Sequence, residues 1–134
     1  MSKYLDHAKQ LRATVEPHYN CGQSVLVPFA KDAGITEETA YAITANFGRG
    51  LRRAAACGAI TGGIVALGLF GIDDAATITA YYRKLREHHD GKLECADLLR
   101  QVKEQGADQH AHCDGLVYEC VSLVESILRE KGKI

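Results

Sequence analysis

Apolar residues recur at helical spacing along most of the chain, and capping residues mark where the predicted helices begin. The first apolar stripe covers residues 4–15, and Pro17 is expected to close this helix. Asn20, with Gln23 three residues later, resembles a capping box, in which each residue's side chain bonds the other's backbone N–H. A second helix is therefore expected to begin at Cys21.

The next part of the chain contains a proline inside a helical pattern. Pro28 removes one backbone hydrogen bond at a cost of roughly 3 kcal/mol, so the second helix is expected to kink or restart there and to end at Gly34. Thr36 is followed by two glutamates, which favour the positive end of a helix dipole. A third helix is expected from Thr36, closed by Gly48 and Gly50.

A glycine-rich segment is expected to form a buried central helix over about residues 52–70. Residues 54–72 carry no charge and approach the roughly 20 residues that span a bilayer. Five glycines dilute their hydrophobicity, so we interpret the segment as buried in the core and expect no membrane insertion. The Gly58-x-x-x-Gly62 spacing also fits a helix-dimer face, which leaves a homodimer as an alternative.

Three more helices complete the prediction. One is capped by Asp73 or Asp74, a short one runs from Cys95 to Lys103, and the last begins near His112. The first of these is expected to bury Ile78, Tyr81, Tyr82 and Leu85. No convincing strand pattern or internal repeat occurs. The sequence predicts an all-α fold, a single-domain multi-helix bundle over residues 1–134 around the glycine-rich helix.

Composition and charge narrow the function. A chain of 134 residues with 46% hydrophobic residues can bury a core without cross-links, and a net charge of -1 predicts no binding to nucleic acid. The polar start lacks the apolar run of a secretory signal, which predicts a cytoplasmic protein. In a reducing compartment, the five cysteines are expected to be thiols unless they bind a metal or cycle catalytically.

Four of the five cysteines lie near predicted helix starts. Backbone N–H groups and the dipole at a helix N-terminus favour thiolate, the species that attacks disulfides and binds metals. The arginines at 49, 52 and 53 would favour the thiolate further at Cys57. The alternative is that each cysteine is a small buried hydrophobe, which is the expectation for mid-helix Cys120. The four are Cys21, Cys57, Cys95 and Cys113.

No C-x-x-C motif indicates a zinc ribbon or a thioredoxin-type pair. Four single cysteines that converge from separate helices would still suit an iron-sulfur cluster, expected first, or a zinc ion, expected second. His112, beside Cys113, is a further candidate metal ligand, unless this stretch is a solvated loop. His88 and His89 are expected to be partners of a helix dipole. No phosphate-binding loop, H-E-x-x-H or G-x-S-x-G motif indicates a hydrolase or transferase.

Taken in order, these cysteine segments form a recognisable pattern. Residues 20–26 read NCGQSVL, residues 57–62 read CGAITG and lead into an apolar run, and Cys95 and Cys113 follow. The pattern resembles the C_GCAxxG_C_C family of redox-active proteins over nearly the whole chain. The resemblance implies a helical module in which Cys21, Cys57, Cys95 and Cys113 act, while Gly58 and Gly62 allow close backbone approach at a cofactor site. Here Cys57 precedes Gly58, the reverse of the family pattern.

Two classes of function follow from these observations. The first is a redox or electron-transfer module with a protein redox partner, using either thiol–disulfide exchange or a metal–thiolate centre. Whether it is an oxidoreductase in its own right stays open. The second is a non-catalytic helical interaction or structural protein, with a homodimer as one form of it, whose cysteines are buried or bind a structural zinc.

Overall fold

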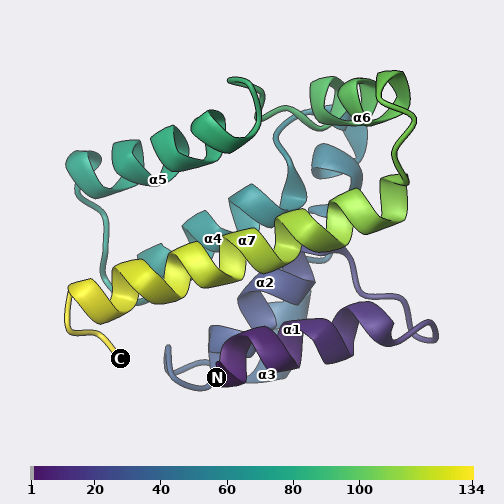
Figure 1. Ribbon diagram of the computed structural model, residues 1–134. Coiled ribbons are helices and arrows are strands. Elements are labelled where there is room, and N and C mark those ends of the chain that lie inside the picture. The colour runs from purple at the N-terminus through teal and green to yellow at the C-terminus, as the bar shows by residue number, and fades with distance from the viewer. Residues whose placement is uncertain (1) are drawn as a thin grey trace.

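The computed structural model describes residues 2–134 and shows an all-α fold (Figure 1). Within these residues there are seven α-helices and no strand. They are α1 (Lys3–Ala13), α2 (Cys21–Ala30), α3 (Glu37–Ile43), α4 (Gly58–Leu69), α5 (Ala75–His88), α6 (Cys95–Glu104) and α7 (Gln109–Glu130). The predicted all-α multi-helix fold with a buried glycine-rich helix is confirmed.

Side-chain caps fix most of the helix starts. Asn20 and Gln23 form the predicted capping box, in which the Gln23 N–H donates to Asn20 Oδ1 at 2.8 Å. Thr36 and Asp74 cap α3 and α5 as predicted. Asp108 caps α7, so this helix begins three residues before the predicted His112. His112 therefore lies within a helix and not in a solvated loop.

Three predicted helix ends are wrong, and local hydrogen bonds mark two of them. The third helix ends at Ile43, before the predicted Gly48, where the Thr44 hydroxyl donates to the Ala40 carbonyl at 2.7 Å. The first helix ends at Ala13, well before Pro17, because Thr14 is extended and its hydroxyl donates to the Gln10 carbonyl at 2.8 Å. The second helix does not restart at Pro28 or reach Gly34. It continues only to Ala30, so the missing proline N–H affects just its final turn.

The glycine-rich helix also starts later than predicted, at Gly58 and not near Arg52. The preceding coil places Arg49, Leu51, Arg52 and Ala54 at φ between 55° and 60°, in the left-handed region. Each such residue costs roughly 1–2 kcal/mol, and the conformation excludes a right-handed helix. We call residues 49–54 the left-handed coil.

The core lies between α2, α4 and α7, and α1 covers one side of it (Figure 1). Helices α2 and α4 meet most closely, because a Cβ at Gly62 would lie 2.8 Å from the carbonyl oxygen of Gly22. The Gly58-x-x-x-Gly62 face therefore packs inside the chain, which leaves the helix-dimer interpretation without a free surface. None of the helices in residues 2–134 combines the length and apolarity needed to cross a membrane.

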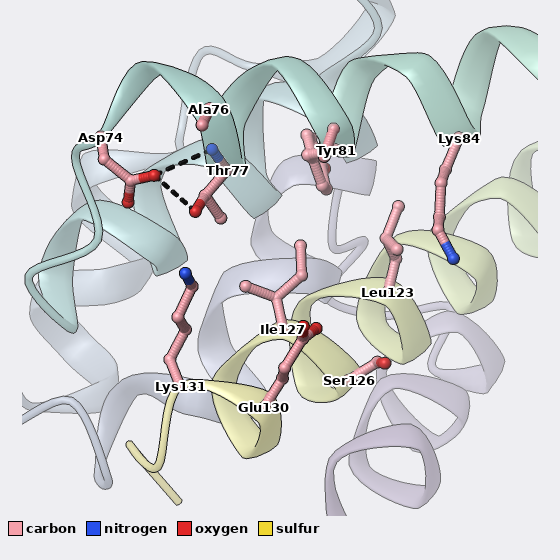
Figure 2. A pocket seen from close by; sticks show the side chains of 11 residues that line it. Asp74, Ala76, Thr77, Tyr81, Lys84, Leu123, Ser126, Ile127, Glu130 and Lys131 are labelled. Carbon is pink, nitrogen blue, oxygen red and sulfur yellow. Dashed lines mark hydrogen bonds between the residues drawn. The ribbon is translucent and has the colours of Figure 1, made fainter.

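Helix α5 lies beside α7 and buries Tyr81 and Leu85, while Ile78 and Tyr82 of the predicted stripe are half-buried. Between α5 and α7 is an open groove of about 250 Å³, which contains no cysteine. Figure 2 shows its entrance, where Asp74 accepts hydrogen bonds from the N–H and hydroxyl of Thr77 at 2.9 Å and 2.6 Å. The groove is thus separate from the cysteines.

Candidate thiol site

Four cysteines from four helices line one small cavity. Cys21 is the first residue of α2, Cys57 is the cap residue before α4, and Cys95 is the first residue of α6. Cys113 lies in the second turn of α7. The cavity is completed by His112, Leu98, Leu99 and Leu116. The four cysteines and His112 named by the sequence analysis are therefore neighbours.

The cavity itself is narrow and mostly apolar. Its volume is about 20 Å³, which is roughly the space of a single water molecule. It adjoins a wider, open cavity of about 460 Å³, which is also lined by the same four cysteines. A molecule in the wider cavity would therefore lie against the thiols.

A short backbone connection joins the starts of α4 and α6. The Cys95 N–H donates to the Ala55 carbonyl at 2.7 Å, and the Cys57 N–H donates to the Leu93 carbonyl at 3.2 Å. These bonds surround an isolated bridge between Ala56 and Glu94. They hold Cys57 and Cys95 at fixed positions on one wall of the cavity.

A buried arginine lies beside the other two cysteines. Arg12 Nε donates to Asp114 Oδ1 at 2.7 Å, and its Nη1 donates to the Tyr19 carbonyl at 3.1 Å. The Arg12 side chain is only 6% exposed. It joins α1 to the start of α2 and to α7, and places a permanent positive charge near Cys21 and Cys113.

Cys21 and Cys113 are neighbouring thiols whose pKa values shift in opposite directions. Interaction with the Cys113 thiol is the main cause that lowers the pKa of Cys21 from 9.0 to about 7, with help from Arg12 and against the effects of burial and Asp114. Interaction with the Cys21 thiol, burial and the charge on Cys21 raise the pKa of Cys113 far above its ordinary value. Cys21 is therefore the thiolate of the pair.

The other two thiols are protonated at neutral pH. Burial raises the pKa of Cys57 to about 12, although the N–H groups of Ala59 and Ile60 favour its thiolate. Burial and the charge of Cys21 also raise the pKa of Cys95, against the effect of Arg49. Among these helix starts only Cys21 has a lowered thiol pKa, because interaction with Cys113 and the charge of Arg12 outweigh its burial, whereas burial is the largest cause at Cys57 and Cys95.

Alkylation of Cys21 is expected to depend on pH in the neutral range. Below pH 7 its rate with iodoacetamide should fall about tenfold per pH unit, because only thiolate reacts and protonation removes it. Arg12→Gln should shift the midpoint upward, since it removes a favourable charge and leaves Asp114 unpaired.

The measurement is peptide mass spectrometry of alkylated Cys21 across pH 5–9. Arg129→Gln is the matched control, because Arg129 forms a surface pair with Glu125 away from the site. A wild-type midpoint near 9, or equal midpoints in wild type and Arg12→Gln, would contradict this assignment.

The remaining predicted residues lie outside the thiol cavity. Cys120 is fully buried in the core, as predicted. His88 and His89 each lie 2.8 Å from a different carboxylate oxygen of Glu119, which links α5 to α7. The ring of His89 meets that of His112 edge-on, with centroids 6.3 Å apart. Both histidines at the end of α5 thus connect helices.

Comparison with protein families places these cysteines in a known pattern. Residues 19–127 match the model of a family described as "Putative redox-active protein (C_GCAxxG_C_C)", which covers most of the chain and all five cysteines. The chain belongs to this family. Comparison of this C_GCAxxG_C_C protein with curated proteins and with solved structures finds no match.

The structure gives a reason for the exchanged order of Cys57 and Gly58 in this C_GCAxxG_C_C protein. A Cβ at position 58 would collide with the carbonyl oxygen of Phe47. At position 57, the side chain lines the cavity with the other cysteines. Gly58 and Gly62 therefore serve the approach of α4 to its neighbours, and the predicted cofactor role of these two glycines has no separate support.

Sequence reasoning missed two charged residues of the C_GCAxxG_C_C site, Arg12 and Asp114, which flank the thiol pair. No motif marks them, because they meet through a contact between distant parts of the chain. Arg49, expected from the sequence to act on Cys57, lines the wider cavity and lowers the pKa of Cys95. In residues 2–134, no three His, Cys, Asp or Glu side chains are placed so that they could hold a metal ion.

Proposed function

We propose that this protein is a thiol redox protein in which Cys21 and Cys113 cycle between two thiols and a disulfide. The observation that carries the proposal is that Cys21 of α2 and Cys113 of α7 line the same cavity of about 20 Å³, close enough for each thiol to shift the pKa of the other. The site opens to solvent through the wider cavity, so another disulfide can reach Cys21. A reducing compartment such as the cytoplasm suits this cycle.

The first step is attack by Cys21 on a substrate disulfide R–S–S–R′. The Cys21 thiolate forms a bond to one sulfur while the S–S bond breaks, and R′–S⁻ leaves with the electron pair. The product is a mixed disulfide between Cys21 and R. Arg12 supports this step because its charge favours the attacking thiolate.

The second step uses Cys113 to release the substrate. The pKa of Cys113 is raised in part by its interaction with the Cys21 thiol and by the charge on Cys21. The mixed disulfide on Cys21 removes both causes. Arg12 then favours the Cys113 thiolate, which attacks the Cys21 sulfur after losing its proton to water. R–S⁻ leaves. Overall, two electrons pass from the two cysteines to the substrate, which becomes two thiols.

A metal–thiolate centre is the second candidate. Its support is that four cysteines and His112, which are ligands suited to zinc or an iron-sulfur cluster, line one cavity. The geometry favours the disulfide cycle, since these donors in residues 2–134 form no metal-holding group and the space among them is about 20 Å³. A cluster would require the helix starts to separate.

Equilibration in buffers of defined dithiothreitol redox ratio tests the proposal. Alkylation and intact-mass measurement should show five free thiols under reducing conditions and three under oxidising conditions, with peptide mapping that joins Cys21 to Cys113. Cys120→Ala, which removes a thiol far inside the core, should show the same loss of two thiols. Five thiols at every ratio, a different linked pair, or stoichiometric iron or zinc in protein purified without oxygen would contradict the cycle.

A further inference from the structure

The wider cavity has the size of a small-molecule site. Its volume of about 460 Å³ lies in the range of roughly 300–1,000 Å³ that is typical of ligand pockets. Its floor is formed by Cys21 and the three other clustered cysteines. The groove between α5 and α7 is smaller and contains no thiol. A compound bound in the wider cavity would lie in contact with the attacking sulfur.

Most of the charges around this cavity are already compensated. Arg12 pairs with Asp114, and His110 Nε2 lies 3.4 Å from the same carboxylate. Asp108 accepts a hydrogen bond from the N–H of Ala111 as the cap of α7. By contrast, the Arg49 side chain makes no hydrogen bond or ion pair within residues 2–134.

Arg49 is held at the rim by the left-handed coil. Its own φ is 55°, and the next residue, Gly50, packs so closely that an added Cβ would lie 2.6 Å from Cys95 Cβ and 2.5 Å from the Ala55 carbonyl oxygen. Left-handed conformations at several non-glycine residues are costly and concentrate at functional sites. Here the costly conformation places a permanent positive charge beside the thiols.

His18 and the helix starts add donors for an anion around the cavity. The His18 ring lines the same cavity and also the adjoining hollow that Arg49 and Arg52 line. Four helices begin around the cavity, and the starts of α4 and α6 have no side-chain cap hydrogen bond. Their positive dipole ends favour an anion in this position.

We propose that this cavity binds a small disulfide that carries a carboxylate, with Arg49 and His18 holding the carboxylate while Cys21 attacks the S–S bond. The proposal rests on the disulfide cycle described above and specifies its substrate class. Atoms and electrons balance as in that cycle: the bound disulfide is the oxidant and leaves as two thiols. An acidic loop of a disulfide-bonded protein offers the same chemistry, but the cavity's size favours a small compound.

Rates of oxidation by three small disulfides test the charge preference. Reduced protein is mixed with glutathione disulfide, which is anionic, with hydroxyethyl disulfide, which is neutral, or with cystamine, which is cationic. Free thiols are then counted by alkylation over time. Wild type should favour the anionic compound over the neutral one, and Arg49→Gln should lower this rate ratio about tenfold at low salt. Added salt should reduce the wild-type preference.

Arg53→Gln is the matched control, because Arg53 belongs to the same coil and is exposed but does not line the cavity. Its rate ratio should equal that of wild type. Equal ratios in wild type and Arg49→Gln would overturn the substrate class while the Cys21–Cys113 cycle stands. Failure of all three disulfides to oxidise the protein would overturn the cycle itself. A peptide disulfide flanked by aspartates that reacts over tenfold faster than glutathione disulfide would overturn the small-molecule assignment.

Discussion

Cys21→Ser is expected to abolish disulfide exchange, whereas Cys113→Ser should stop it halfway. Without Cys21, burial still raises the pKa values of Cys57, Cys95 and Cys113, and Cys113 has no mixed disulfide beside it to attack. Without Cys113, Cys21 can still attack a disulfide, but no neighbouring thiol releases the product. Incubation with hydroxyethyl disulfide should therefore give no adduct on Cys21→Ser and a stable mixed disulfide on Cys113→Ser, as read by intact mass.

Two results would decide against these roles. If Cys21→Ser loses two thiols to oxidation at the wild-type rate, another pair carries the reaction. If Cys113→Ser forms an intramolecular disulfide as readily as wild type, Cys113 is not the resolving thiol. Cys120→Ala serves as the control in both cases, since this fully buried residue lies in the core of α7. It should behave as wild type.

Gly62→Ala is expected to destabilise the fold, because this buried glycine lies against the backbone of α2. The new methyl group would lie 2.8 Å from the carbonyl oxygen and 3.0 Å from the Cα of Gly22, both backbone atoms of α2. Separating α2 from α4 should cost about 3 kcal/mol, the upper range for overpacking. Urea denaturation followed by circular dichroism measures the free energy of unfolding.

Gly68 provides the matched control in the same helix. A Cβ at Gly68 meets nothing within 4 Å, so Gly68→Ala should stabilise the protein by about 0.5–1 kcal/mol through helix propensity alone. Equal free energies of unfolding for the two variants would show that α2 and α4 do not meet at Gly62.

The helices could be predicted where local chemistry decides them. Asn20 with Gln23, Thr36 and Asp74 are caps whose hydrogen bonds lie within four residues, so the sequence is sufficient. The left-handed coil could not be predicted, because its three arginines, Leu51 and Ala54 favour a helix locally. Close packing of Gly50 against Cys95 outweighs that preference.

The candidate site could likewise be predicted only in part. The cysteines could be nominated from their motif and their places at helix starts, yet the pairing of Cys21 with Cys113 depends on how α7 crosses α2. The pKa expectations failed at Cys57 because burial cannot be read from a helix start. Arg12 and Asp114 enter the site through a contact between distant parts of the chain, for which no local signal exists, whereas Arg49 could be named from its place shortly before Cys57.

Cys21 and Cys113 lie near opposite ends of the sequence, on helices α2 and α7. A covalent link between them would close a loop of about 90 residues, which restricts the unfolded chain by roughly 4.6 kcal/mol. By the thermodynamic cycle that connects folding with oxidation, the native structure strengthens the bond by the same amount. The reduction potential of the pair and the difference in unfolding free energy between oxidised and reduced protein are therefore two measurements of a single quantity. A substitution that weakens the oxidised fold more than the reduced one should make the link easier to reduce.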